Sequence, residues 1–509
     1  MRIAQTSHIE TTDPLRILFS ADWQLAILVY EGLVGYKKNS LQLEPLLAES
    51  WQLLDNGLGY RFFLRKDVHF HDDPCFPGNT GRQLTAADVL YTFERLAECS
   101  KECPNWYLLD GKISGLTDFV NGSADSIAGV RIIDDYTIEF HLTKRYATFL
   151  KILASPTTFI LPQEAVTYYG ENIAYHPVGT GPFRLVRWSP FEKIELTRNE
   201  RYWKRKDGRP LPYLNGLSVN CYDDVSLAFS AFLKGETDLF RAGEHFSKTL
   251  SETMFDSAQY VTLSAPVGLT VRFFGFSLDN LSVYSKDRSL RRAVSLAFDR
   301  EKLVAGAPAF RSFPAHTLVP DCFFSHIRIP GIKQNVAAAR SLLGEHNPVP
   351  PLYICTNIEA TDISTLKREL GDVDIPVHMD IRPSAYFPHI MKERPDLFRL
   401  AFIPSFPDPE EYYQLFHSST AKDVNLTGYA NPEYDRVLEE TMTEMDARKR
   451  EEKFLELEKI LRRDVPAIFV SHSRPVSYII PKTVRGLQLS FIFPDFSAVY
   501  LESPDERRN

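Results

Sequence analysis

The sequence predicts an α/β protein of two or three domains. Segments with helical periodicity alternate with strand-like segments along the whole chain, which is typical of α/β layers. A chain of 509 residues is too long for one simple hydrophobic core, so more than one domain is expected. With 44% hydrophobic and 24% charged residues, the composition is that of a globular protein.

The clearest elements are, in chain order, a hairpin at 130–142, a strand at 192–196, and helices at 226–233, 290–304 and 446–463. The hairpin consists of two β-rich runs that flank Asp134. In the last helix, Asp446 is placed to cap the N-terminus, and Phe454, Leu457 and Leu461 share one face. We therefore expect this helix to pack on a core through that face.

Charge and hydropathy narrow the classes of partner. The formal net charge of -8 argues against nucleic acid and anionic membrane. No apolar run approaches the roughly 20 residues of a transmembrane helix. Residues 1–6 show no apolar stretch after the basic start, so we expect no signal peptide in this sequence. The protein is then either cytoplasmic or exported with a leader that has been removed.

Six cysteines are few for this length, so disulfides are not expected to be the main source of stability. One bridge could form within a local group, which consists of Cys75, Cys99 and Cys103. Buried free thiols are expected at the isolated cysteines, which are Cys221, Cys322 and Cys355.

An ordered set of motifs runs from about residue 31 to residue 486. It comprises EGL at 31–33, LAESW at 47–51, YRFFLR at 60–65, VHFHD at 68–72, LTAADVLYTF at 84–93, PVGTGPF at 177–183, NERYW at 199–203, GETDL at 235–239, the helical run 291–303, NLTGYANPEYD at 425–435 and VPAI at 465–468. In this order the set resembles bacterial extracellular solute-binding proteins of the oligopeptide, dipeptide and nickel class.

The resemblance implies a periplasmic-binding-protein-like α/β fold with two lobes. Its main first domain comprises 1–39, 178–262 and 475–509, a smaller domain is inserted at 40–177, and the second lobe spans 263–474. Two chain crossings form a hinge, for which Pro266 and Pro475 are candidates. Ordinary loop prolines are an equally good interpretation of both residues.

The resemblance also implies a function. The protein would capture a peptide or another small solute and deliver it to the permease of an ABC importer. It would act in the periplasm or at the outer face of the cytoplasmic membrane, as a monomer, with no catalytic residue, cofactor or resident metal.

The stretch 402–409 resembles the family's W-x-x-D-Y-x-D-P pattern, in which the first carboxylate pairs with the free α-amine of a bound peptide. Here that position is Ser405, and aromatic residues Phe402 and Phe406 flank it. Asp408 occupies the second, more structural acidic position. An ammonium group taken out of water needs a partner. Either the ligand lacks a free amine, or another acid supplies the contact.

Other ligand candidates rest on position alone. Trp23 follows an early strand of the first lobe, and Phe274 and Phe276 lie where the chain enters the second lobe. Arg382 and Tyr386 follow the β-like run VHMDI. For Trp23 and Arg382, helix packing and a solvated surface position are the alternative interpretations.

Two other functions compete. His69, His71 and Asp72 could hold a catalytic metal, because alternate strand residues face the same side, although a structural role is favoured. A cytoplasmic ligand-sensing module of the same fold is the second alternative.

The run 179–182 lacks the Lys-Ser/Thr of a phosphate loop and predicts a tight turn instead. No GxSxG motif occurs, so the usual signal of an α/β-hydrolase is missing.

Overall fold

The computed structural model describes residues 1–242, 258–306, 312–324, 329–344, 346, 348–490 and 493–502. The chain divides into two compact units. Unit 1 comprises Met1–Ala242, Met254–Pro266 and Val476–Asn509, and unit 2 comprises Gly243–Thr253 and Val267–Pro475. The chain thus changes units directly after Pro266 and directly after Pro475. Whether these prolines form a hinge stays a prediction.

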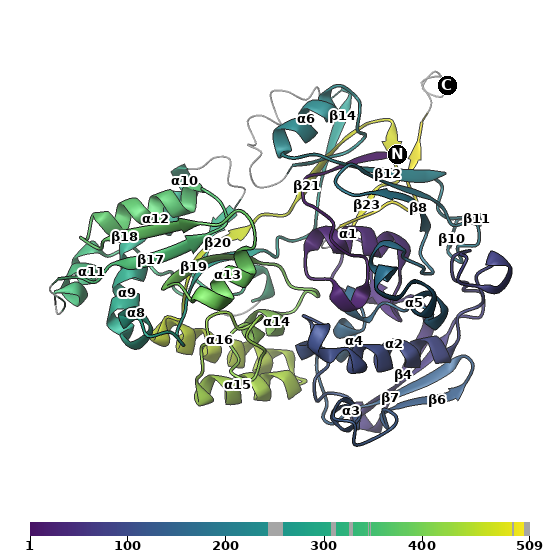
Figure 1. The fold of residues 1–509 in the computed structure, drawn as a ribbon, viewed down its shortest axis with the longest axis horizontal. Coiled ribbons are helices and arrows are strands. Elements are labelled where there is room, and N and C mark those ends of the chain that lie inside the picture. The colour runs from purple at the N-terminus through teal and green to yellow at the C-terminus, as the bar shows by residue number, and fades with distance from the viewer. Residues whose placement is uncertain are drawn as a thin grey trace. The chain divides into compact units, whose positions relative to one another are not determined.

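Unit 1 contains three main sheets, whose strands are ordered β1-β12-β9-β8, β13-β21-β14 and β4-β5-β7-β6. The first comprises β1 (Arg2–Gln5), β12 (Gly216–Cys221), β9 (Lys193–Arg198) and β8 (Phe183–Ser189). The second comprises β13 (Phe240–Ala242), β21 (Ser477–Pro481) and β14 (Tyr260–Ser264). Because β21 is its central strand, the C-terminal part of the chain completes a sheet of unit 1 (Figure 1).

The third sheet of unit 1 contains the predicted hairpin. Its strands are β4 (Ala48–Leu54), β5 (Gly59–Leu64), β7 (Thr137–His141) and β6 (Val130–Asp134). β6 and β7 pair antiparallel, which confirms the hairpin at 130–142. The predicted strand at 192–196 is β9, and the predicted helix at 226–233 is α6 (Val225–Leu233).

The helices in the described part of unit 1 are α1 (Ser20–Val29), α2 (Ala86–Glu98), α3 (Leu116–Val120), α4 (Phe149–Ile152), α5 (Gln163–Tyr169) and α6. At the start of α2, the backbone of Asp88 bonds the Thr85 side chain, and the Asp88 side chain accepts from the Thr85 backbone. This reciprocal cap explains why the helix begins at Ala86.

Unit 2 is built on a six-stranded sheet of order β16-β20-β15-β19-β17-β18. Its strands are β16 (Ser312–Pro314), β20 (Ala467–Ser473), β15 (Val271–Phe276), β19 (Leu397–Phe402), β17 (Leu352–Thr356) and β18 (Val377–Ile381). Helices cover both faces, so each face has its own core (Figure 1).

Phe274 and Phe276 of β15 face the first core, which also includes residues of α9 (Arg288–Ala297), α11 (Val336–Leu343) and α12 (Thr361–Gly371). Val271 and Phe273 face the second core. The helices of this second core are α14 (Pro409–Gln414), α15 (Pro432–Thr443) and α16 (Ala447–Asp464). β15 therefore has core on both sides, with alternate side chains pointing to each.

The prediction of one continuous helix at 290–304 is wrong in one respect. The structure divides it into α9 and α10 (Arg300–Gly306). Phe298, which ends α9, is extended and packs against Phe274, with ring centroids 6.1 Å apart. The Asp299 carboxylate accepts a hydrogen bond from the Lys302 amide at 2.9 Å, so it caps a new helix.

The helix expected at 446–463 is confirmed as α16. The Asp446 side chain caps it by accepting hydrogen bonds from the amides of Arg448 and Lys449, both at 3.0 Å. Phe454, Leu457 and Leu461 are buried together, as predicted.

All six cysteines are free thiols, so the bridge considered within Cys75, Cys99 and Cys103 is absent from the structure. The expectation of burial holds for Cys355 but not for Cys322, which is exposed, or Cys221, which is half-buried. Within the described residues, no helix combines the length and the apolar character that crossing a membrane would require.

Candidate functional site

Three of the sequence motifs meet at one buried carboxylate of unit 1. Glu31 accepts hydrogen bonds from the Thr180 hydroxyl at 3.0 Å, the Tyr202 hydroxyl at 2.9 Å and the Trp203 indole at 3.0 Å. Burial raises the pKa of Glu31. The motifs EGL, PVGTGPF and NERYW thus supply one internal network, which we call the Glu31 cluster.

The turn at 179–182 is held by His71, whose side chain is buried. The imidazole Nε2 lies 2.9 Å from the Gly181 carbonyl oxygen, and Nδ1 accepts from the Gly179 amide at 3.4 Å. These partners require the neutral tautomer with its proton on Nε2. Burial agrees with this state, because it lowers the pKa of His71 to about 4.

The glycines of this turn are required by close packing. A Cβ atom on Gly179 would lie 2.1 Å from the Val29 carbonyl oxygen, and one on Gly181 would lie 2.7 Å from the same oxygen. The turn therefore fits against the end of α1 only without side chains. It is a packing motif, in agreement with the interpretation that rejected a phosphate loop.

The metal-hydrolase hypothesis loses its proposed ligands. Both ring nitrogens of His71 have backbone partners, so neither has a lone pair to offer a metal in this arrangement. Asp72 pairs with Arg201 and accepts from the Gly81 amide at 3.0 Å. The His69 backbone bridges to Gln83, and within the described residues His69, His71 and Asp72 do not gather as a set of metal ligands.

In unit 1, the ligand candidate Trp23 lies on α1 and is only 4% exposed. Its indole Nε1 has no hydrogen-bond acceptor within the part of the chain that the structure describes. The packing interpretation accounts for the position of this ring, and a ligand contact at Trp23 stays a prediction.

In unit 2, Phe274 and Phe276 have fully buried side chains. Both belong to the core between the sheet and α9, α11 and α12. They offer no surface to a ligand, so their packing speaks against the role that sequence position suggested.

The segment after β19 contains the position at which the family pattern has its first acid. Ser405 is 2% exposed, and its amide and hydroxyl both donate to Glu411, at 2.9 Å to Oε1. The Phe406 amide also donates to Glu411, at 3.2 Å. Glu411 lies on α14, and no sequence pattern points to it. The turn of α14 brings this carboxylate back to residue 405.

The Asp408 carboxylate pairs with Arg450. The same carboxylate caps α14 by accepting from the Glu410 amide at 3.0 Å. The Arg450 guanidinium donates hydrogen bonds to both Asp408 carboxylate oxygens, at 2.7 and 2.9 Å, and to the Glu410 carboxylate at 2.9 Å. This geometry fits the structural role expected of the second acidic position.

The aromatic residues that flank Ser405 differ in accessibility. Phe406 is 1% exposed, which favours core packing. Phe402 is half-buried at the end of β19, with its ring edge-on to Tyr412 at 5.4 Å between centroids. Of the two rings, only Phe402 keeps an accessible part.

Arg382 and Tyr386 lie next to a third group of polar residues. Arg382 is exposed, as the surface interpretation expected, and its Nε lies 2.8 Å from Asp380 Oδ1. Tyr386 is 7% exposed and donates its hydroxyl to the Arg399 carbonyl at 2.6 Å. His389, on the same helix α13 (Tyr386–Glu393), lies 2.9 Å from Asp380 Oδ2. Asp380 and His389 were not singled out from the sequence.

A pocket of unit 2 adjoins this group. It is lined by Tyr353, Ile354, His378, Met379, Asp380, His389, Glu393, Arg394, Pro395 and Asp396. The rings of Tyr353 and His378 are stacked, with centroids 4.9 Å apart. The pocket therefore combines one aromatic wall with several polar groups.

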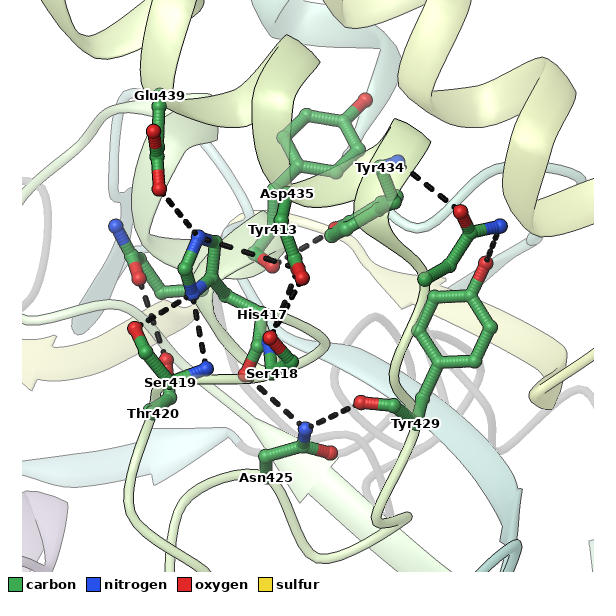
Figure 2. A network of polar contacts seen from close by, with 12 residues as sticks. Tyr413, His417, Ser418, Ser419, Thr420, Asn425, Tyr429, Tyr434, Asp435 and Glu439 are labelled. Carbon is green, nitrogen blue, oxygen red and sulfur yellow. Dashed lines mark hydrogen bonds and ion pairs between the residues drawn. The ribbon is translucent and has the colours of Figure 1, made fainter.

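The motif NLTGYANPEYD also has a structural explanation. The Asn425 side chain donates to the carbonyl oxygens of His417 at 3.1 Å and Tyr429 at 2.9 Å. Figure 2 shows the His417 ring between Ser419 and the carboxylates of Asp435 and Glu439 on α15. These contacts fix the loop between α14 and α15.

Comparison with known proteins agrees with this architecture. Residues 42–423 match the family of bacterial extracellular solute-binding proteins, family 5 (middle). The chain is 26% identical over 502 residues to the peptide transport periplasmic protein SapA of Salmonella typhimurium, covering 95% of this chain and 88% of that protein. It is 25% identical to heme-binding protein A of Haemophilus influenzae, with 93% and 87% coverage.

The fold is shared with the periplasmic binding protein DppA of Helicobacter pylori, solved in complex with the peptide STSA. The TM-score is 0.85 at 22% identity, and the match covers 99% of this chain and 98% of that one. The predicted periplasmic-binding-protein-like α/β fold is thereby confirmed. The relatives are named for peptide transport in the periplasm and for haem binding, so neither the hydrolase nor the cytoplasmic sensor is favoured. The chain belongs to the family 5 bacterial extracellular solute-binding proteins and serves an ABC importer from the outer side of the cytoplasmic membrane.

Proposed function

We propose that this protein captures a peptide-like or other small solute without anchoring a free α-amine at residue 405. The observation that carries the proposal is the pairing of Ser405 with Glu411. A desolvated ammonium group requires a carboxylate that can turn toward it. The carboxylates of Glu411 and Asp408 instead hold the segment itself together.

The names of the relatives support a range of ligands that includes solutes other than free-amine peptides. One is named for peptide transport and another for haem, a molecule that has no amine. The scaffold is therefore compatible with solutes that offer no N-terminal ammonium. The half-buried ring of Phe402 supports an aromatic contact with such a solute.

The test compares peptides in matched pairs, each with a free and an N-acetylated terminus, together with haem as an amine-free solute. Calorimetry measures affinity, and the thermal upshift provides a second readout. We expect acetylation to change the affinity less than about threefold. A free-amine form that binds more than about 30-fold tighter, roughly 2 kcal/mol, would contradict the proposal.

A gain-of-function variant sharpens this test. The double substitution Ser405→Asp with Glu411→Gln introduces a carboxylate at 405 and removes the neighbouring one, which would repel it. We expect this variant to prefer free-amine peptides by about tenfold. Glu411→Gln alone is the matched control and should show no such preference.

We further propose that the protein acts as a monomer, without enzymatic activity and without nucleic-acid partners. The net charge of -8 supports the last point. We also propose the domain limits implied by the resemblance, including the insertion at 40–177, and a hinge near Pro266 and Pro475. Light scattering measures the oligomeric state. Small-angle X-ray scattering should show compaction when the solute binds, and its absence at saturation would exclude a closing hinge.

A further inference from the structure

Unit 2 contains three potential metal ligands of different chemistry at one point. Cys355 on β17 and Asp380 on β18 are paired neighbours in parallel strands. His389 reaches the same point from α13. The sulfur of Cys355, a carboxylate oxygen of Asp380 and a ring nitrogen of His389 all lie within 4.8 Å of one another.

We propose that Cys355, Asp380 and His389 bind a divalent transition-metal ion, with Zn²⁺ as the best match. Thiolate, carboxylate and imidazole are all common Zn²⁺ ligands. Around a tetrahedral Zn²⁺ the ligand atoms would be separated by roughly 3.3–3.6 Å, given the usual bond lengths. Binding would therefore draw the three ligand atoms, now within 4.8 Å of one another, closer together. The ion takes the place of the hydrogen bond between His389 and Asp380, and the thiol proton of Cys355 is released to solvent.

Surrounding contacts hold the three ligands in place. The Tyr386 hydroxyl donates to the carbonyl oxygens of Arg399 at 2.6 Å and Cys355 at 3.3 Å, which fixes the start of α13 against β17 and β19. The Arg382 Nε lies 2.8 Å from Asp380 Oδ1 and 3.0 Å from Oδ2, so it holds the carboxylate in orientation beside His389. Tyr386 and Arg382 are thus positioning residues, of the kind that tunes metal affinity.

The ligands also differ in access, as an open metal site requires. Cys355 is buried in a small core with Tyr386 and Ile390. Asp380 and His389 line the pocket described above, so an ion can enter from that side. Three protein ligands leave the fourth coordination position toward the pocket, where water or a donor atom of a solute completes the shell.

The experiment uses the full chain, stripped of metal with a chelator. Zn²⁺ affinity is measured by competition with a chromophoric chelator. Co²⁺ is added separately, because thiolate coordination gives it a charge-transfer absorption in the near ultraviolet. We expect one equivalent of either ion and a clear thiolate band. Neither readout depends on solute, so the result is independent of the amine proposal.

Variants assign the ligands. Cys355→Ala should abolish the band, and His389→Gln and Asp380→Asn should each weaken Zn²⁺ binding by about 100-fold. Tyr386→Phe should weaken it by about tenfold. Cys221→Ala and His346→Gln are the matched controls and should bind like the parent.

The side chains of His389 and Asp380 are 22% and 43% exposed, so their variants should fold even if the buried alanine substitution does not. Less than half an equivalent of bound Zn²⁺, no thiolate band, or unchanged affinity in both His389→Gln and Asp380→Asn would overturn the proposal.

Discussion

Glu458 of α16 makes the stability of unit 2 depend on pH. Its side chain is fully buried, and Oε1 accepts from the Leu318 amide at 2.9 Å and the Tyr413 hydroxyl at 3.0 Å. Among the described residues, Oε2 has no hydrogen-bond partner of normal geometry. Burial raises the pKa of Glu458 from 4.5 to about 7. The folded protein therefore keeps this carboxyl group protonated at pH values where the unfolded chain has lost the proton.

The sign of the effect follows from proton linkage. Between pH 4.5 and about 7 the folded state binds one more proton than the unfolded state, so the free energy of unfolding falls as pH rises. At about 1.4 kcal/mol per pH unit, the loss across this window is about 3 kcal/mol. Below pH 4.5 the contribution of Glu458 is fully present, and above about pH 7 it has been lost.

Glu458→Gln removes this titration. The amide keeps an acceptor for Leu318 and Tyr413, but its NH₂ group is buried without a partner, which costs about 1–2 kcal/mol. We expect the variant to be less stable than the parent at pH 4.5 and more stable at pH 8. The difference between the two proteins should change by about 3 kcal/mol over this range.

Differential scanning calorimetry from pH 4.5 to pH 8 measures this difference through the melting temperature of unit 2. For a domain of about 200 residues, 3 kcal/mol corresponds to a relative shift of roughly 6–12 °C. Glu456→Gln, an exposed position on the same helix, is the matched control for the substitution itself. A constant difference between Glu458→Gln and the parent across the range would refute the reasoning.

Three further predictions separate folding from binding. Gly179→Ala should destabilise unit 1 by about 3 kcal/mol, because its Cβ would overlap a carbonyl oxygen of α1. Gly344→Ala is the control and should melt like the parent, because its Cβ would meet nothing closer than 3.5 Å. Glu31→Ala should cost about 2–4 kcal/mol in thermal unfolding, because it leaves two buried donors and the half-buried Trp203 indole unpaired. Unchanged melting would contradict the cluster. Asp408→Asn should lower stability by about 3 kcal/mol by weakening the pairing with Arg450, while solute affinity of the folded protein stays the same; a selective loss of affinity would identify Asp408 as a ligand contact.

Periodicity predicted the elements well where one physical cause dominated. The 446–463 helix has a capping aspartate, a single apolar face and a proline after its end, and all three agree with α16. The 290–304 segment carries the same apolar period, yet α9 ends at the extended Phe298 and Asp299 caps the next helix. A single residue with a local hydrogen bond can thus override a periodic pattern.

The ligand candidates were less predictable because tertiary contacts decide what a side chain faces. The position of Phe274 and Phe276 at the entry to unit 2 predicts a ligand contact, but β15 is an interior strand with helices on both sides. Asp380 and His389 lie nine residues apart on different elements, and Cys355 lies on a third. No motif spacing connects the three, so only the folded sheet reveals them as neighbours.

The motifs that identify the family turn out to be buried and internally paired. Glu31, Thr180 and His71 are each at most 4% exposed, and each is hydrogen-bonded to another motif. Such residues specify the scaffold, so they carry little information about the solute. We propose that ligand identity depends instead on positions where this chain departs from the family pattern. Ser405 is the clearest of these, because its hydroxyl and amide donate to Glu411. Substituting this pair should alter ligand selectivity. The fold should be retained, because the Glu31 cluster is unchanged.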